Sequence, residues 1–488
     1  MAKRPVGAAF FDLDRTLLAG GSGPVFAATL KRLGVSTPRV PGQDALFRLF
    51  DLVGESYVLM QFARQATRRI AGLERAMVQA AAEVAADDVL ALLQPYAAAT
   101  LAEHRGAGDL LVLATTSPFD LVVPVARRLG FDALVATRFE VVDGVYTGEL
   151  DGPFAWGPGK LDAVRAWAAE NGVDVAASAA YSDSIFDAPL LSAVGRPVAV
   201  NPDARLRVLA TLRRWPVRSL DVPSGVPSVG GVEPYDFVRT LARSELFPAA
   251  RFTFDGIEHI PTTGPAIVAA NHRSYFDPIA LGYAIGKAGR NPRFLGKKEV
   301  FDAPIVGTLA RALGGIRVDR GSGSDEPLRQ AAAALEAGEI VVILPQGTIP
   351  RGQAFFEPLL EGRSGVARLA AMVDAPVIPV GLWGTEKVWP RSSKVPNVLN
   401  VASPPDVCIR VGAAVRGLAR TAAVGSTRID TERVMAAIMA LLPNEARVRR
   451  DPSAEELARA TPRGARPAAS GPARVAPTRR LGGSLADR

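Results

Sequence analysis

The chain has 488 residues, of which 48% are hydrophobic and 22% charged, so it is long enough to form two or three globular domains. Its net charge is +8, and the single cysteine, Cys408, excludes an intrachain disulfide and a cluster of thiolate metal ligands. No uncharged apolar run reaches the roughly 18 residues of a membrane-spanning helix, and no signal-peptide segment follows Met1, so we expect a protein of a reducing cytoplasm.

The first predicted strand, Val6 to Phe11, ends in an acidic loop. Asp12 and Asp14 lie two positions apart in this loop, and Thr16 follows them. Two carboxylates with this spacing can share one loop mouth and act there as a nucleophile and a general acid. The alternative is an acidic turn in which Thr16 helps to cap the next segment. Residues further along the chain favour the first interpretation.

Three later segments supply groups that suit a phosphate ester. An apolar strand, Leu111 to Ala114, ends at Thr115. Lys160 follows a Gly-Pro-Gly turn and opens an amphipathic helix. Asp183 and Asp187 lie four positions apart after a stretch of small residues. Together these segments predict phosphoryl transfer through an aspartyl phosphate, with Thr115 and Lys160 holding the phosphate oxygens.

In this interpretation Asp12 is the nucleophile, and Asp14 protonates the leaving alcohol and then activates water. A hard cation such as Mg²⁺ is needed because an anionic carboxylate must approach an anionic phosphate. Its expected ligands are the carboxylates of Asp12 and Asp183 and the backbone carbonyl of Asp14.

The order and spacing of these blocks resemble the haloacid dehalogenase superfamily, in particular its phosphoserine-phosphatase-like branch, over most of residues 5–210. The resemblance implies a domain over residues 1–215 with a Rossmann-like α/β core and a helical cap at about residues 23–103. Arg15 departs from the family by standing where its first motif has Gly. The substrate stays open between phosphoserine and a glycerolipid phosphate, and a regulatory, inactive domain is the alternative.

Residues 216–232 are rich in Pro, Ser, Gly and Val and predict a linker. The next segment, Tyr235 to Phe247, is expected to be an amphipathic helix that packs on its own domain or lies on lipid.

The segment after that helix predicts a catalytic base. An apolar strand, Ala266 to Ala270, is followed by His272 and, five positions later, by Asp277. An imidazole can take a proton from a hydroxyl near neutral pH, and a carboxylate can orient the ring. Alternatively, Ser274 and Asp277 form a capping box, and His272 is an ordinary loop residue.

Three further strand-like runs, at residues 294–297, 314–319 and 340–344, lead to cations or to a turn rich in Gly and Pro. The cations are Lys297, Lys298 and Arg320. Several strand ends that carry cations beside a histidine base predict a pocket for an anionic acceptor with a reactive hydroxyl.

These blocks resemble, in order, the glycerolipid acyltransferase family of the 1-acylglycerol-3-phosphate acyltransferase type, over about residues 233–445. The resemblance implies that His272 deprotonates the acceptor hydroxyl, that Asp277 orients the histidine, and that the alkoxide attacks the thioester of acyl-CoA or acyl carrier protein. It also implies that the acceptor phosphate binds Arg320 and the third block, represented here by Gln346, Gly347 and Thr348. Gln346 replaces the usual Glu, and Arg351 sits later than the family's basic residue. No metal or acyl-enzyme is implied for this domain.

Residues 446–488 contain ten Arg and four acidic residues among many Pro, Ala and Gly, and predict a disordered basic tail. We expect an anionic membrane surface as its partner, rather than nucleic acid. Together the two resemblances imply a bacterial α/β enzyme of phospholipid biosynthesis that makes phosphatidate from lysophosphatidate. We expect it in the cytoplasm, peripheral on the inner face of the plasma membrane. The alternatives are an acyltransferase for another acceptor with an inactive phosphatase-like domain, and a basic surface-binding protein.

Overall fold

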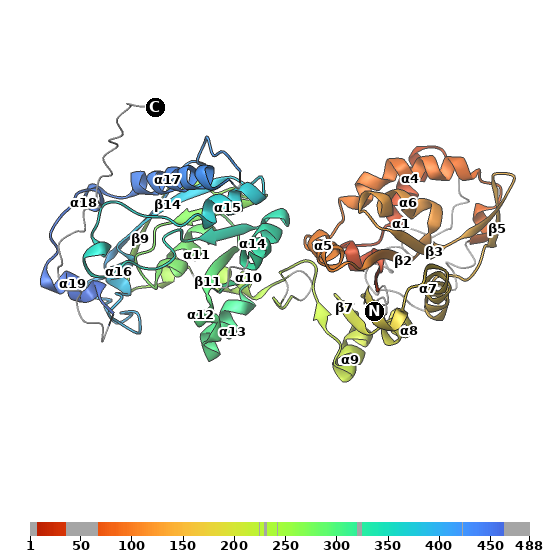
Figure 1. Cartoon of the computed structure of the whole chain (residues 1–488), viewed down its shortest axis with the longest axis horizontal. Coiled ribbons are helices and arrows are strands. Elements are labelled where there is room, and N and C mark those ends of the chain that lie inside the picture. The colour runs from red at the N-terminus through yellow and green to blue at the C-terminus, as the bar shows by residue number, and fades with distance from the viewer. Residues whose placement is uncertain are drawn as a thin grey trace, which may run out of the picture.

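A computed structural model describes residues 7–35, 67–223, 225–228, 232–241, 243–319, 325–421 and 423–462. These residues form two α/β units, each built on its own sheet (Figure 1). The predicted α/β class is therefore confirmed for both halves of the chain.

The first unit is organised around a sheet of six strands in the order β3-β2-β1-β6-β7-β8, and every pair in it is parallel. The strands are β1 Ala8–Phe11, β2 Leu110–Pro118, β3 Ala133–Thr137, β6 Ala179–Ser182, β7 Arg196–Val200 and β8 Val217–Arg218. β1 lies between β2 and β6, and all four of its residues are buried. Because parallel strands end at one edge of a sheet, the loops after β1, β2 and β6 meet there.

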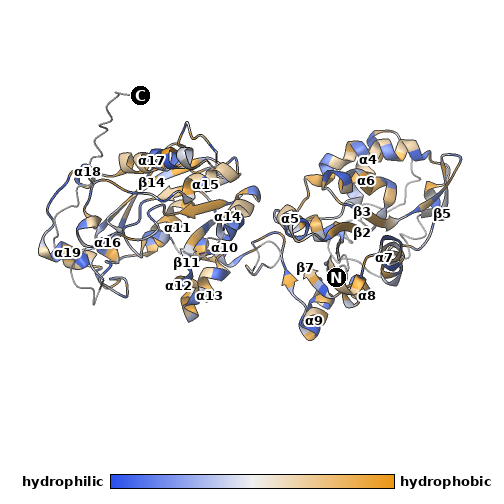
Figure 2. Cartoon of the chain, in the orientation of Figure 1, coloured by the Kyte–Doolittle hydropathy of each residue, from blue (hydrophilic) through white to orange (hydrophobic). Residues whose placement is uncertain are grey.

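Helices cover both faces of this sheet, which is the Rossmann-like arrangement that the sequence predicts. They are α1 Gly23–Arg32, α4 Arg75–Leu90, α5 Ala97–Ala107, α6 Phe119–Arg128, α7 Pro158–Asn171, α8 Ala188–Ala193 and α9 Ala204–Arg213. Shorter elements are η1 Leu13–Leu17, η2 Thr67–Ile70, η3 Val175–Ala177, η4 Ile185–Asp187 and the hairpin of β4 Phe139–Val142 with β5 Val145–Leu150. In Figure 2, α4 and α6 carry both hydrophilic and hydrophobic residues, as helices with one buried face do.

Two observations concern boundaries expected in the first half of the chain. α5, at the end of the cap expected at residues 23–103, packs on β2, and its Leu101 joins the core cluster of the sheet. β8 pairs with β7 at residues 217–218, so these residues belong to the sheet and not to the linker expected at residues 216–232. A two-residue edge strand leaves too short an apolar run to be recognised in the sequence.

The second unit is built on a sheet of seven strands in the order β12-β11-β13-β10-β14-β15-β9. The strands are β9 Arg251–Asp255, β10 Ala266–Ala270, β11 Pro292–Lys297, β12 Ile316–Val318, β13 Ile340–Ile343, β14 Val377–Trp383 and β15 Asp406–Val411. All pairs are parallel except β14 with β15. β10 is central, so the loop that follows it lies between the loops after β13 and β14.

The helices of the second unit are α10 Pro234–Leu241, α11 Asp277–Lys287, α12 Lys298–Asp302, α13 Pro304–Ala312, α14 Glu326–Glu336, α15 Gly365–Met372, α16 Thr385–Val388, α17 Val424–Leu441, α18 Asn444–Arg447 and α19 Ala454–Ala460, with the short turns η5 Ser244–Leu246, η6 Ile257–His259 and η7 Gly352–Phe355. The helix expected over residues 235–247 is therefore divided into α10 and η5. Its first residue, Tyr235, is 7% exposed, so this helix packs on its own unit.

The basic segment expected to be disordered from residue 446 begins with ordered structure. Ser453 and Glu456 form a capping box at the start of α19. Ala460, at the end of this helix, packs in a small core cluster with Ile349 and Phe355. The structure describes this segment as far as residue 462, and residues 463–488 lie outside the described ranges. Within those ranges, no helix combines the length and the apolar character needed to cross a membrane.

Candidate active sites

The first candidate site lies at the carboxyl edge of the six-stranded sheet and is centred on Lys160. This side chain is 2% exposed, and its ammonium group donates to Asp12 Oδ1 at 2.9 Å and to Asp187 Oδ2 at 2.7 Å. Ser182 donates to the same oxygen of Asp187 at 2.7 Å. α7 begins with Pro158, so Lys160 stands in its first turn, where the fixed backbone directs it at the loop after β1.

Asp14 and Thr115 approach each other through Ser117. The hydroxyl of Ser117 donates to Asp14 Oδ2 at 2.9 Å, and its backbone N–H donates to Thr115 Oγ1 at 3.2 Å. The other carboxylate oxygen of Asp14 accepts the backbone N–H of Ser22. The loop after β1 and the end of β2 therefore bring the predicted acid and the predicted phosphate-binding hydroxyl close together.

Asp183 is held against the loop after β1 by Thr16. The Thr16 hydroxyl donates to Asp183 Oδ1 at 3.1 Å, and the Asp183 backbone N–H donates to Thr16 Oγ1 at 3.0 Å. Thr16 thus joins two loops instead of capping a helix. Arg15 has a φ of 62°, the left-handed region that Gly adopts easily, and its Nε lies 3.6 Å from Asp183 Oδ2.

The donor chemistry of this site suits a hard cation. Asp187 Oδ1 is buried and has no hydrogen-bond partner among the described residues. Asp12 and Asp183 directly follow the neighbouring strands β1 and β6. Carboxylate oxygens are the ligands that Mg²⁺ prefers. In the described part of the chain, however, no three His, Cys, Asp or Glu side chains are grouped closely enough to hold a metal ion. Lys160 on Asp12 and Arg15 on Asp183 neutralise these carboxylates.

The second candidate site lies after β10 and is centred on Asp277. Its Oδ2 accepts from His272 Nδ1 at 2.8 Å, from the backbone N–H of Arg273 at 2.6 Å and from that of Ser274 at 2.8 Å. Its Oδ1 accepts from Thr385 Oγ1 at 2.6 Å. Asp277 is 0% exposed, whereas the side chain of His272 is 16% exposed. The carboxylate therefore serves the backbone turn and the histidine together. The alternative capping box does not form, because Phe276 caps α11 without a side-chain hydrogen bond and the Ser274 hydroxyl accepts the Phe276 backbone N–H at 2.9 Å.

Arg273, next to His272, forms an ion pair with Glu386 in α16. Its guanidinium donates to both carboxylate oxygens of Glu386, at 3.1 and 3.0 Å, and lies over the rings of Phe355 and Trp383. Burial raises the pKa of Glu386, but the charge and hydrogen bonds of Arg273 outweigh burial, so this pKa lies below its usual range. The ion pair fixes α16 against the loop that carries His272.

The third sequence block also reaches this site. The side-chain oxygen of Gln346 accepts the backbone N–H of His272 at 2.6 Å, an acceptor role that the usual Glu could also fill. Gly347 has a φ of 71°, and the next residue, Thr348, accepts from Lys297 at 3.4 Å. Arg320, the expected phosphate ligand, lies outside the described residues.

Several contacting residues were not among the predicted site residues. Asp187 is noted in the sequence for its spacing to Asp183 but is given no role there, and the structure places it against Lys160. Thr385 and Glu386 carry no local signal, since they lie 108 and 113 positions from their partners Asp277 and Arg273.

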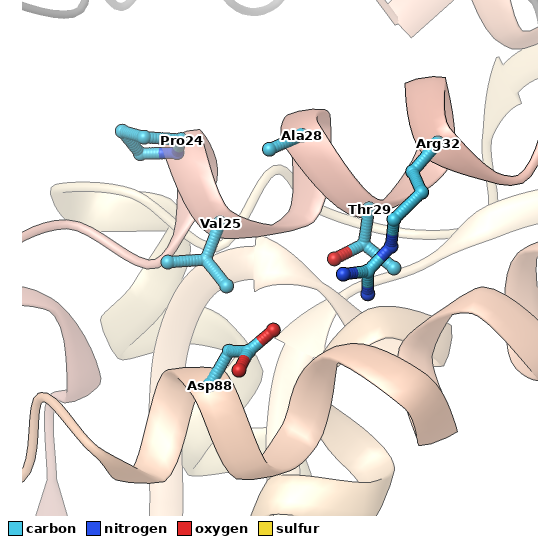
Figure 3. A pocket seen from close by; sticks show the side chains of 6 residues that line it. All are labelled: Pro24, Val25, Ala28, Thr29, Arg32 and Asp88. Carbon is cyan, nitrogen blue, oxygen red and sulfur yellow. The ribbon is translucent and has the colours of Figure 1, made fainter.

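A hollow of about 440 Å³ lies elsewhere in the first unit, between α1 and α4 (Figure 3). The side chains of Val25, Arg32 and Asp88 point into it. None of the predicted catalytic residues lines this hollow, so it is separate from both sites.

Comparisons with known proteins agree with the two units. Residues 9–192 match the haloacid dehalogenase-like hydrolase family, and residues 251–383 match the acyltransferase family. A Streptomyces azureus protein named inhibition of morphological differentiation protein is 38% identical over 224 residues, which are 45% of this chain and 80% of that protein. A Mycobacterium tuberculosis protein named phosphoserine phosphatase is 37% identical over 227 residues, 46% of this chain and 74% of that protein.

Among solved structures, the 1-acyl-sn-glycerophosphate acyltransferase of Thermotoga maritima is similar with a TM-score of 0.31 and 23% identity. The similarity covers 42% of this chain and 77% of that chain.

Proposed function

Because this chain belongs to the haloacid dehalogenase-like hydrolases through its first unit and carries an acyltransferase domain in its second, we propose that it combines a phosphomonoester hydrolase with a glycerolipid acyltransferase. In this proposal the acyltransferase moves a fatty acyl group from acyl-CoA or acyl carrier protein to the free hydroxyl of 1-acyl-sn-glycerol 3-phosphate. The product is phosphatidate, which places the enzyme in phospholipid biosynthesis.

The observation that carries the acyltransferase proposal is the hydrogen-bonded pair of His272 and Asp277. Nδ1 donates to a buried carboxylate, so Nε2 of the neutral ring is left as the proton acceptor. The acceptor hydroxyl loses its proton to Nε2, and its oxygen attacks the thioester carbonyl. When the tetrahedral intermediate collapses, the C–S bond breaks and the leaving thiolate takes the proton from the imidazolium. Asp277 stabilises that imidazolium throughout.

Two features of the second unit support an anionic lipid as the acceptor and a membrane surface as its source. Lys297, at the end of β11, contacts the third block, and a phosphate would find a cation there. On α13, Ile305 is 84% exposed, and Val306 and Leu309 are each 55% exposed. An exposed apolar face of this kind suits contact with lipid. We extend the proposal to peripheral binding at the cytoplasmic face of a bacterial membrane.

In the proposed phosphatase, Asp12 attacks phosphorus and forms an aspartyl phosphate, while Asp14 protonates the leaving alcohol. Asp14 then removes a proton from the water that hydrolyses the aspartyl phosphate. Thr115 and Lys160 hold the phosphate oxygens. Asp12, Asp183 and the backbone carbonyl of Asp14 would hold a Mg²⁺ ion, whose charge would offset the charges of the carboxylate and the phosphate. The substrate is phosphoserine or a glycerolipid phosphate.

Both activities can be tested on the full chain. Acyl transfer is measured to lysophosphatidate from acyl-CoA and from acylated acyl carrier protein, and phosphate release is measured from a panel of phosphomonoesters that includes phosphoserine. We expect phosphatidate to form with or without EDTA, and phosphate release to require Mg²⁺. If no phosphatidate forms with either donor, the acceptor assignment is wrong, and Gln346 is the first residue to suspect. If no phosphomonoester is hydrolysed, the alternative of a regulatory, inactive first unit is favoured.

A further inference from the structure

Arg391 is a buried arginine that has no hydrogen-bond or ion-pair partner among the residues that the structure describes. It is 9% exposed, and its Nε is buried without a hydrogen bond. Among the described residues, none forms a hydrogen bond or an ion pair with its guanidinium. Burying an unpaired charge is costly, so charged side chains that lie inside proteins are nearly always paired or bind a ligand.

The surroundings of Arg391 place it beside the acyltransferase site. It lies two residues after Trp389, whose backbone carbonyl accepts the hydroxyl of Ser274 at 2.6 Å. The Trp389 ring lies 5.8 Å from the ring of Tyr275. The segment that carries Arg391 is therefore fixed to the loop that carries His272.

A second contact fixes this segment from the other side. The backbone N–H of Ser392 donates to the backbone carbonyl of Arg459 in α19 at 3.2 Å. α19 in turn packs on η7, directly after the third sequence block. The segment that carries Arg391 is thus held between the His272 loop and α19.

Arg351, the last charged residue of the third block, is a second cation to consider, at the start of η7. It is exposed, and no hydrogen bond or ion pair joins it to another described residue. Burial lowers the pKa of Arg391, the Tyr275 phenol raises it, and the charge of Arg351 lowers it further. Arg351 caps η7, on which α19 packs, and Ser392 next to Arg391 is bonded to α19, so the segments that carry the two arginines meet at this helix. Among the described residues, neither guanidinium is paired with a carboxylate. The nearby Arg273, by contrast, is paired with Glu386.

We propose that Arg391 and Arg351 form a phosphomonoester-binding subsite beside His272, which holds the phosphate of one substrate of acyl transfer. This inference rests on the proposed acyltransferase function and extends it. Two guanidinium groups suit a phosphate dianion, since each can donate two parallel hydrogen bonds to it. A ligand of this class removes the repulsion between the two cations and pairs the buried one. The phosphomonoester is that of the glycerolipid acceptor or the 3′-phosphate of CoA.

The test compares wild type, Arg391→Gln, Arg391→Lys and, as a matched control in the same segment, the exposed Lys394→Gln. KM and kcat are measured for lysophosphatidate and for acyl-CoA, and again with acyl-dephospho-CoA as the donor. We expect Arg391→Gln to raise one KM about tenfold or more while kcat changes little, because charge-assisted hydrogen bonds to the ground state are lost. Arg391→Lys should have an intermediate effect, and Lys394→Gln should have none.

The donor series identifies the source of the phosphate. If Arg391→Gln raises the KM for lysophosphatidate with both donors, the subsite binds the phosphate of the acceptor. A raised KM for acyl-CoA that is absent with acyl-dephospho-CoA assigns the CoA phosphate. Unchanged KM values for lysophosphatidate and acyl-CoA in a folded Arg391→Gln protein overturn the inference.

Two further measurements keep the inference falsifiable. If Arg391→Gln does not fold, the exposed Arg351→Gln is measured instead, and an unchanged KM there overturns the subsite. If wild type transfers no acyl group, the proposed function fails, and calorimetric binding of lysophosphatidate and of CoA to wild type and Arg351→Gln decides the subsite. Binding of one of them that the substitution weakens at least about tenfold supports it, and equal or absent binding overturns it.

Discussion

Replacing Asp277 by Asn removes the charge of this residue while retaining its hydrogen bonds. Oδ2 accepts three donors, whereas Oδ1 accepts only the hydroxyl of Thr385. An Asn whose carbonyl oxygen takes the Oδ2 position keeps all three bonds, and its amide group can donate to the Thr385 hydroxyl. Each bond loses charge assistance, about 1 kcal/mol, so we expect the free energy of unfolding to fall by about 1–3 kcal/mol.

The rate of acyl transfer should fall far more than this small loss of folding stability can explain. The Asn side chain still orients His272, but it cannot stabilise the imidazolium, so we expect kcat to fall by about 10²- to 10⁴-fold. Asp277→Ala differs in kind, because it leaves four donors without an acceptor. At about 1–3 kcal/mol for each buried unpaired group, the loss is at least about 4 kcal/mol, a large share of the stability of a domain.

The assay measures acyl transfer to lysophosphatidate and urea denaturation on the same preparation, with phosphate release as an internal control. We expect Asp277→Asn to stay folded, to keep phosphate release and to lose acyl transfer. A folded Asp277→Asn protein with acyl transfer within about threefold of wild type would refute the role of the His272–Asp277 pair as the base.

Three other substitutions test separate parts of the account. Lys160→Met removes the cation between two buried carboxylates, so the free energy of unfolding of the first unit should fall by about 3–5 kcal/mol, and an unchanged denaturation midpoint would contradict this. Glu386 has a folded pKa below the usual 4.5, so its stabilising effect is present above that pH and is lost as pH falls through the folded value. Glu386→Gln should therefore flatten the acid side of the stability profile, and an equally steep acid side would argue against the pairing with Arg273. Gln346→Glu adds a negative charge beside His272 and should move the acidic limb of the kcat/KM profile upward by up to about one pH unit; an unmoved limb would show that the two groups are not coupled.

Buried parallel strands were the easiest elements to predict. β10 occupies Ala266–Ala270, the range that the sequence predicts, because both faces of a central parallel strand are covered and every residue is apolar. β9, Arg251–Asp255, was not predicted, since polar residues alternate along it and no position is fully buried. Its place at the edge of the sheet leaves it half in solvent, where the apolar signal is weak.

The predicted catalytic residues lie in short blocks that follow strands, which local sequence reveals. Their hydrogen-bond partners lie in distant parts of the chain, which local sequence does not reveal. Asp12 and His272 each follow an apolar run, so their position at a sheet edge could be deduced. The contact of Asp277 with Thr385 depends on the pairing of β10 with β14, which Asn271 reinforces by hydrogen bonds of 2.9 and 2.7 Å to the backbone of Leu382. Register between strands 111 residues apart cannot be read from local sequence.

The basic segment at the end of the chain shows how composition can mislead. Ten Arg in residues 446–488 predict disorder, yet α19 forms within it. The signal for this helix was present, because Ser453 and Glu456 have the spacing of a capping box. What the sequence could not show is the apolar cluster with Phe355 that holds the helix in place.

The central claim is that one chain carries two independent active sites. The most direct test measures phosphatidate formation and phosphate release in wild type, His272→Ala and Asp12→Asn. We predict that His272→Ala abolishes phosphatidate formation and retains phosphate release, and that Asp12→Asn does the reverse. Phosphatidate formation that survives in His272→Ala, or that is lost in a folded Asp12→Asn protein, would contradict the claim.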